Sequence, residues 1–199
     1  MRNYIALLLC FLLLLAAVPL QVSAYETEGD FIYEVYNEQA SLLQYNGSDK
    51  VVEVPGELGG CPVVRIDTYA FKGTGLTSIS IPAKVTTIGN YAFQNCTSLT
   101  TAVLEENASS TTVSTTLGNY VFDGCTALNN ITLSKHVKTI GTYAFKGTAI
   151  TSMVVPEGVT SLGQQAFENC TALTEVTLGN SKLASIGSAL FKNCTALNT

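Results

Sequence analysis

His136 is the residue of this chain best suited to acid–base or metal chemistry, and it is the only histidine. It lies in the polar segment LSKHVKTI, between two more regular stretches. A Ser/His/Asp site or a zinc site also needs partners that converge on the ring, and no acid or nucleophile stands at such a spacing. The sequence therefore predicts a solvated loop histidine without a catalytic role.

Cysteine is the second residue type that could perform chemistry, as a nucleophile, a metal ligand or half of a disulfide. Four cysteines share the context F-x-x-C-T, and two further copies of this context carry threonine instead. The slot is occupied by Thr74, Cys96, Cys125, Thr148, Cys170 and Cys194. Because neither a metal site nor a disulfide common to all copies would tolerate threonine, the pattern predicts buried free thiols. One or two disulfides between neighbouring copies, such as Cys96 and Cys125, remain an alternative.

Other signatures of catalysis and of cofactor binding are missing from the sequence. Glu105 and Glu106 lie in a polar stretch, Asp67, Asp123 and Glu168 are scattered, and no phosphate-binding glycine motif occurs. Residues 61–199 carry seven acids and eight bases, so no basic stripe is present to bind nucleic acid. We expect a non-enzymatic protein without cofactor, metal or nucleic-acid partner.

The N-terminus has the pattern of a secretory signal peptide. Arg2 precedes an apolar run from Tyr4 to Leu20, and Val22-Ser23-Ala24 supplies small residues before a cleavage site. We expect removal of residues 1–24 and a mature chain with no membrane span. An uncleaved membrane anchor is the alternative, since the run is near the lower length limit of a span.

One phrase of the form V-T-x-I-G-x-x-A-F-x-x-C-T recurs six times along the rest of the chain. Its phenylalanine stands at positions 71, 93, 122, 145, 167 and 191, so the spacing is 22 to 24 residues except for one of 29. The longer unit contains the polar stretch 105–116, which is typical of a loop insertion in a stack of repeats. We expect Phe93, Phe145 and Phe167 to form a continuous internal stack.

A second element, L-x-x-φ-x-φ (φ an apolar residue), lies between the copies of this phrase. Its alternation of apolar and polar residues favours a short, half-buried strand. The inward positions would be Ile79/Ile81, Ala102/Leu104, Ile131/Leu133, Met153/Val155 and Val176/Leu178. The Ile-Gly and Ala-Phe steps of the first phrase favour a tight turn followed by a single helical turn. A strand and a short turn in about 23 residues are typical of leucine-rich repeats.

Together, the two elements resemble the BspA-like leucine-rich repeats of bacterial surface and secreted proteins. The opening, Phe31 to Tyr45 followed by YNGSDKVVEVPGELGGCPVVRIDTYAF, is similar to the N-terminal capping hairpin and first repeat of that family. The chain departs from the pattern at Cys61, where the family usually has a larger polar or aromatic residue. We expect a signal peptide at 1–24, a cap at 25–62 and repeats at 63–199.

The expected fold class is α/β: a horseshoe-shaped leucine-rich-repeat solenoid with a β-hairpin cap. A parallel β-sheet would line its concave face, and short helical turns its convex face. The family resemblance implies a secreted or surface-exposed module that binds an extracellular or host-surface protein or glycan. Candidate contacts on the concave face are Ser78, Ser80, Thr101, Val103, Asn130, Thr132, Ser152, Val154, Glu175 and Thr177. A passive spacer in a larger surface protein is the alternative.

The last repeat stops at Thr199, before the two inward positions of its strand. An uncapped repeat exposes both its core and an unpaired strand edge. We therefore expect either a piece of a longer repeat protein or a chain that self-associates end to end.

Overall fold

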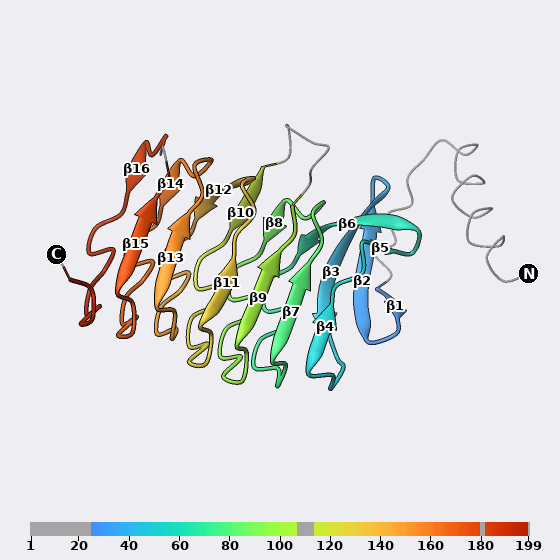
Figure 1. Ribbon diagram of the computed structural model, residues 1–199. Coiled ribbons are helices and arrows are strands. Elements are labelled where there is room, and N and C mark those ends of the chain that lie inside the picture. The colour runs from blue at the N-terminus through green and yellow to red at the C-terminus, as the bar shows by residue number, and fades with distance from the viewer. Residues whose placement is uncertain (1–24, 107–113, 180–181, 199) are drawn as a thin grey trace, which may run out of the picture.

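The computed structural model describes residues 25–106, 114–179 and 182–198 as a stack of similar coils (Figure 1). The expected signal peptide, residues 1–24, lies outside the described residues, as does the part 107–113 of the expected insertion. The N-terminal strands are β1 (Glu26–Glu28), β2 (Phe31–Tyr36), β3 (Gln39–Tyr45), β4 (Val51–Glu53), β5 (Glu57–Leu58) and β6 (Cys61–Ile66).

Each following coil contributes two strands, one from each of the two repeated elements. The L-x-x-φ-x-φ element forms β7 (Ser78–Ile81), β9 (Thr101–Leu104), β11 (Asn130–Thr132), β13 (Ser152–Val155) and β15 (Glu175–Leu178). In each of these coils, the segment that precedes the glycine of V-T-x-I-G in the first phrase forms the second strand. These strands are β8 (Thr87–Ile88), β10 (Thr115–Leu117), β12 (Val137–Ile140), β14 (Ser161–Leu162) and β16 (Ser185–Ile186).

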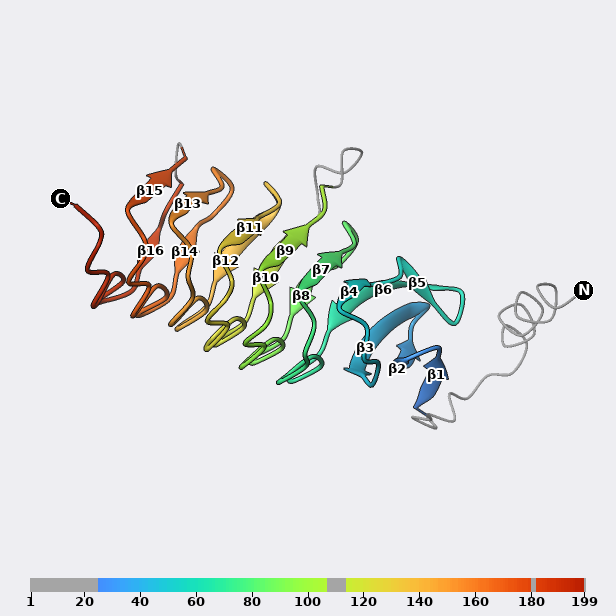
Figure 2. The same ribbon diagram turned by 60° about the horizontal axis from the view of Figure 1, so that its bottom comes forward.

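The two sets of strands belong to separate sheets (Figure 2). From β6 on, the even-numbered strands continue the cap in one ten-stranded sheet, in which β6, β8, β10, β12, β14 and β16 are parallel neighbours. From β7 on, the odd-numbered strands form two smaller sheets: β11, β9 and β7 join β4 in a four-stranded sheet, and β13 and β15 form a two-stranded sheet. The expectation of a single parallel sheet is therefore wrong, because the V-T-x-I segment of the first repeated phrase also forms paired strands.

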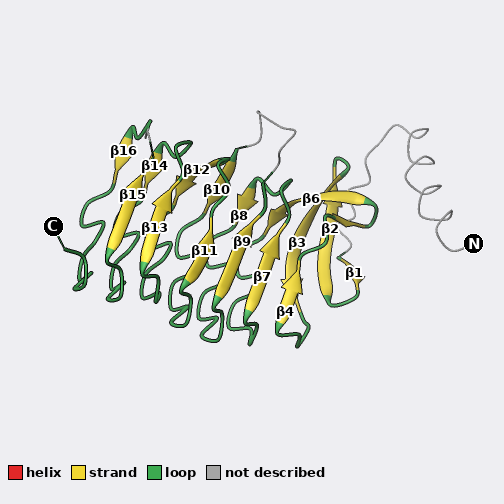
Figure 3. Ribbon diagram, viewed as in Figure 1, coloured by secondary structure: helices red, strands yellow, loops and turns green. Residues whose placement is uncertain are grey.

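The expected α/β class and short helical turns are wrong as well, since the described residues contain strands and loops but no helix (Figure 3). The backbone of the segment after each even-numbered strand explains the difference. In the first coil, Tyr69 and Gly73 have positive φ angles of 64° and 69°, far from the −63° of an α-helix. The N–H groups also alternate: Lys72 donates to Tyr69 within its coil, whereas Phe71 donates to Ala92 of the next coil. Every second N–H group thus joins neighbouring coils, and no helical ladder can propagate.

The expected phenylalanine stack is confirmed and extends through all six coils. Successive ring centroids from residue 71 to residue 191 lie 5.0, 5.2, 5.5, 5.4 and 5.6 Å apart. The first five rings are fully buried, and Phe191 is partly buried. Tyr45 and Phe31 continue the stack into the cap.

The cap is the expected hairpin: β2 and β3 pair in antiparallel fashion, and β3 then pairs in parallel with β6 of the first coil. The glycine after each even-numbered strand has a different role from the expected tight turn. A Cβ atom at Gly89 would lie 2.6 Å from the backbone nitrogen of Thr68, so a side chain here would push two coils apart.

Most of the expected inward positions are buried or partly buried, as the alternation predicts. Leu178 is the exception, since 47% of its surface is exposed. It lies on β15, whose only partner is β13 on the preceding coil, so one side of the strand has no neighbour among the described residues.

Candidate binding surface

The ten residues expected to contact a partner lie at outward positions of the odd-numbered strands. Strand pairing places them in rows across the coils, and none of the ten is buried. One row contains Ser78, Thr101 and Asn130, and a second contains Ser80, Val103 and Thr132. On the two-stranded sheet, Ser152 pairs with Glu175 and Val154 with Thr177.

The structure divides this surface into two parts, because β11 and β13 belong to different sheets. The first six candidates share the four-stranded sheet, and the last four share β13 and β15. We refer to the two parts together as the odd-strand face. Its most exposed apolar side chain is Val154, at 66%. Acidic side chains lie at the edge of the first part. Ser80 donates a hydrogen bond of 2.7 Å to Glu105, and it pairs with Glu53 of β4.

A row of tyrosines that the sequence analysis did not single out lies along the turn of the first four coils. Tyr69, Tyr91, Tyr120 and Tyr143 stack with ring centroids 5.1, 4.8 and 4.8 Å apart. All four are at least partly exposed, and we call them the tyrosine ladder. The signal was present in the sequence, since each tyrosine stands two residues before a core phenylalanine.

Two lysine side chains lie over the first and the last ring of the tyrosine ladder. The ammonium groups of Lys72 and Lys146 lie over the rings of Tyr69 and Tyr143, 4.7 and 5.2 Å from the centroids, as cation–π pairs. Partial burial and neighbouring ionisable groups raise the pKa of Tyr120, so its hydroxyl stays protonated well above neutral pH.

The cysteines of the repeated slot are buried thiols, as expected, and they form an internal ladder with two threonines. Each thiol donates to the phenylalanine carbonyl of an earlier coil, for example Cys96 to Phe71 at 3.0 Å and Cys125 to Phe93 at 3.0 Å. Interaction with the neighbouring Cys96 thiol, together with burial, raises the pKa of Cys125. Burial raises the pKa of Cys170 to about 11, which keeps it protonated and unreactive at neutral pH.

His136 is not the solvated loop residue that the sequence suggested, because only 7% of its surface is exposed. Its Nε2 atom lies 3.9 Å from Oε2 of Glu106, and its backbone N–H donates to the Ser134 hydroxyl at 3.2 Å. Glu106 also accepts a hydrogen bond of 2.7 Å from the backbone of Lys135. These contacts bind the start of the expected insertion to the next coil.

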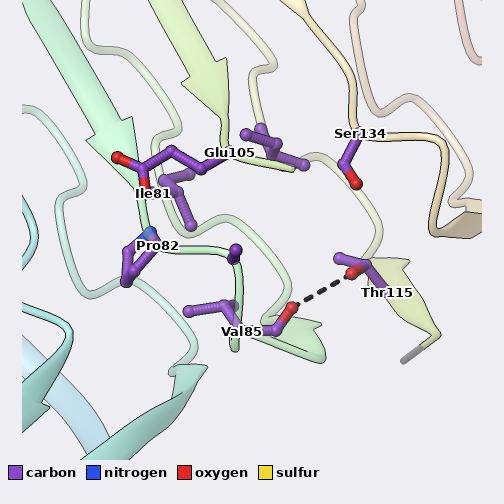
Figure 4. Close-up of a pocket in the computed structure, with 8 residues that line it drawn as sticks. Ile81, Pro82, Val85, Glu105, Thr115 and Ser134 are labelled. Atoms are coloured by element: carbon purple, nitrogen blue, oxygen red, sulfur yellow. Dashed lines mark hydrogen bonds between the residues drawn. The ribbon is translucent and has the colours of Figure 1, made fainter. Parts of the chain in front are cut away.

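A small cavity of about 10 Å³ lies beside this insertion (Figure 4). Its lining includes Ile81, Val85, Glu105, Thr115 and Ser134, and the Thr115 hydroxyl donates to the Val85 carbonyl at 3.0 Å. This volume corresponds to one water molecule at most, so the cavity is too small for a substrate.

A larger open cleft of about 470 Å³ lies on the cap. Tyr25, Ile32 and Leu43 supply apolar walls, and Glu34 and Asp67 supply carboxylates. Asp67 is already engaged by Arg65 at 3.1 Å and by the backbone of Thr68 at 2.8 Å.

Across the described residues, no group of three or more His, Cys, Asp or Glu side chains is placed to hold a metal ion. The same residues contain no helix that is long and apolar enough to cross a bilayer.

A sequence model of the BspA type leucine-rich repeat region matches the chain in six copies, over residues 64–114 and 109–199. Among proteins with curated descriptions, none is significantly similar in sequence.

Three solved structures resemble the chain over most of its length. A leucine-rich cell surface protein from Faecalibacterium prausnitzii A2-165 is 28% identical with a TM-score of 0.73, and the match covers 88% of this chain and 54% of that protein. A leucine-rich repeat protein from Bacteroides ovatus ATCC 8483 is 30% identical with a TM-score of 0.73, covering 86% and 45%. A leucine-rich repeat protein of T. pallidum, 23% identical with a TM-score of 0.71, covers 88% and 91% and supports the fold alone. The chain thus spans about half the length of the first two proteins.

Proposed function

The chain belongs to the BspA-type leucine-rich repeat family, and from this premise we propose that it is a non-enzymatic module that binds an extracellular protein through the odd-strand face. The observation that carries the proposal is the arrangement of the ten outward residues in rows on rigid, parallel strands. A repeated strand holds its side chains in fixed positions, so a partner can be bound with little loss of conformational freedom in the module.

The centre of such a contact would lie at the apolar and uncharged residues of the face. Val154 is exposed on β13, and Thr132 lies on the neighbouring coil. Energetically important residues of protein interfaces cluster in the middle of the contact area, where water is excluded. Charges at the edge, such as Glu105 and Glu175, would instead influence the association rate and its dependence on salt.

We further propose that the module acts outside the cytoplasm, as a secreted protein or as part of the cell surface. The similar protein from F. prausnitzii is a cell surface protein, and the N-terminal residues 1–24 have the pattern of a signal peptide. Mass spectrometry of the exported protein would find Tyr25 as its first residue. A chain that retains Arg2 in the membrane fraction would contradict cleavage.

Capture of extracellular-matrix proteins on the immobilised protein tests the binding function. The double variant Thr132→Arg/Val154→Trp should lose the captured protein by at least about tenfold, with an unchanged melting temperature, because it replaces the middle of the face. The matched variant Lys138→Arg/Gln164→Trp, on other surfaces, should bind like the wild type. Loss of binding in the Lys138/Gln164 variant alone would contradict the assignment to the odd-strand face.

Capture of no protein at all would favour a passive spacer in a larger surface assembly. The last coils favour a second mode of association, end to end, because Leu178 and Ile186 are 47% and 59% exposed and Phe191 is only partly buried. A protein of residues 25–199 should therefore show a mass in light scattering that rises with concentration, and Ile186→Glu should suppress the rise. A monomer at all concentrations would contradict self-association.

A further inference from the structure

The tyrosine ladder carries unused hydrogen-bonding groups in a regular line. The Tyr143 hydroxyl donates to Oε1 of Gln165 at 2.6 Å. The hydroxyls of Tyr69, Tyr91 and Tyr120 make no hydrogen bond within the described part of the chain, and their rings are partly exposed to solvent. Three phenols, each able to donate and accept, are therefore free for a ligand.

The fold does not require tyrosine at these positions. Tyr69, Tyr91, Tyr120 and Tyr143 have positive φ angles of 57° to 64°, which are unfavourable for a bulky residue. The fifth and sixth coils form the same turn with Gln165 and Ala189, each at a φ of 53°. A tyrosine at this slot is thus not needed to form the turn.

The surface beside the tyrosine ladder is rich in uncharged polar groups with the same repeat. Four residues before Tyr91, Tyr120 and Tyr143, the residues Thr87, Thr116 and Thr139 pair across neighbouring even-numbered strands. Arg65 holds this position before Tyr69, and its charge is compensated by an ion pair of 3.1 Å with Asp67. Between the two rows, the exposed Asn90 and Asn119 cap the backbone N–H groups of the next coil at 2.7 and 2.8 Å.

The nearest charges do not select an ionic partner. Lys72 and Lys146 would repel a polycation, and Asp123, whose carboxylate accepts a hydrogen bond of 2.9 Å from Gln94, would repel a polyanion. A ligand that runs along the whole ladder meets both signs, so an uncharged ligand fits this surface best.

From these observations we propose that the tyrosine ladder, with the threonine row beside it, binds an extended, uncharged polysaccharide that runs along the axis of the solenoid. The ring spacing of 4.8 to 5.1 Å is close to the advance of one sugar ring in an extended 1,4-linked chain. Each coil would then present one phenol to one sugar, whose hydroxyls both donate and accept hydrogen bonds. An extended peptide advances by about 3.3 Å per residue, so successive coils would not meet equivalent residues.

The tyrosine ladder is also rigid before the ligand arrives. Stacking holds Tyr91 and Tyr120 between two rings, and Tyr69 and Tyr143 against one ring each. The backbone N–H groups of the tyrosines also donate to the next coil, for example Tyr91 to the carbonyl of Asn119. Little conformational entropy would be lost on binding, which favours a long ligand held by many weak contacts. This site goes beyond the protein-binding function proposed above, because it lies on the turns and not on the odd-strand face.

Migration of the purified protein in native gels that contain hydroxyethylcellulose, xylan or galactomannan tests the proposal. At least one of these polysaccharides should retard the protein. Calorimetry with the matching oligosaccharides should show an affinity that rises with chain length until the four rings of the ladder are spanned. An affinity that is independent of length, or no retardation by any of the three, would overturn the proposal.

The double variant Tyr91→Phe/Tyr120→Phe keeps the stack and removes two free hydroxyls, so it should bind at least about tenfold more weakly at an unchanged melting temperature. Tyr91→Gln/Tyr120→Gln, which copies the residue of the fifth coil, should lose binding as well. The Thr132→Arg/Val154→Trp variant should bind the polysaccharide like the wild type, which separates this site from the odd-strand face. Unchanged retardation of both tyrosine variants would overturn the assignment.

Discussion

Two aromatic stacks run through this molecule side by side, and only one of them is core. In each of the first four coils a tyrosine and a phenylalanine are separated by one alanine or valine, as in Tyr91-Ala92-Phe93. Both stacks have similar ring spacing, 4.8 to 5.1 Å for tyrosine and 5.0 to 5.6 Å for phenylalanine. The phenylalanine occurs in all six coils, whereas the tyrosine is replaced by Gln165 and Ala189 in the last two.

The difference between the stacks shows that burial, and not stacking, determines what a coil must contain. A buried ring is surrounded by side chains on all sides, so its removal leaves a cavity in addition to the lost transfer free energy. A ring at the surface loses only its contacts with two neighbours, and water fills the space. The tyrosine positions are therefore open to residues selected for other purposes.

The largest expected effect is that of Phe145→Ala. Phe145 is fully buried between Phe122 and Phe167, so truncation should lower the free energy of unfolding by about 3–5 kcal/mol. Urea denaturation followed by circular dichroism measures the change. If the variant melts within a degree of the wild type, the ring is not part of the core.

Tyr120→Ala should have a smaller effect, about 1–2 kcal/mol, because the ring stacks on Tyr91 and Tyr143 but fills no cavity. Alanine occupies the same slot at residue 189 with a similar backbone, so no strain is added. The same urea titration applies. A loss equal to that of Phe145→Ala would remove the distinction between the two stacks.

Alkaline pH should separate a buried tyrosine from the exposed ones. Burial, the hydrogen bond of 3.0 Å from its hydroxyl to Glu26 and the charge of that carboxylate raise the pKa of Tyr33 from 10.0 to about 12. The folded state thus holds this proton more tightly than the unfolded state. The contribution to stability is complete below pH 10 and is lost as the pH rises towards 12. Unfolding midpoints measured across this range should fall less steeply in Tyr33→Phe, and an equal slope in both proteins would contradict the assignment.

The smallest effect is expected from the cysteine ladder, which is buried like the phenylalanine stack but needs no covalent bond. Thiol titration of the denatured, unreduced protein should find most of the five cysteines of residues 25–199 reduced. Addition of a reductant should shift the melting temperature by less than about 2 °C. Detection of a single thiol would indicate two disulfides in place of the hydrogen-bonded ladder.

Much of the fold could be predicted because the same pattern of apolar and polar residues recurs in every repeat. The alternation in segments such as Ser78–Ile81 predicted strands and their inward faces, and the phenylalanine of each phrase predicted the internal stack. The slot shared by Thr74 and Cys96 predicted buried thiols, since one position held both residue types. The outward residues of the odd-strand face followed from the same alternation.

Other features could not be predicted because they depend on contacts between coils. The helical turn expected after Gly89 was wrong, since every second N–H group there is bonded to a neighbouring coil. His136 stands in a polar segment, and it is buried only because that segment packs beside Glu106 of the preceding coil. The line of free hydroxyls on the tyrosine ladder exists only because tyrosines from neighbouring coils stack on one another.

The sequence by itself determined the repeat, the choice of core residues and the membership of a solenoid family, because burial selects residue types that recur at a fixed period. Only the tertiary structure decided that the first repeated phrase also contributes strands to a sheet, that the odd-strand face is divided between β11 and β13, and which aromatic stack faces solvent. The physical reason is that these properties belong to pairs of coils. The residue type does not specify which carbonyl group accepts the hydrogen bond of its backbone N–H group. Whether that acceptor lies within the coil or in the next one is decided only when the coils pack.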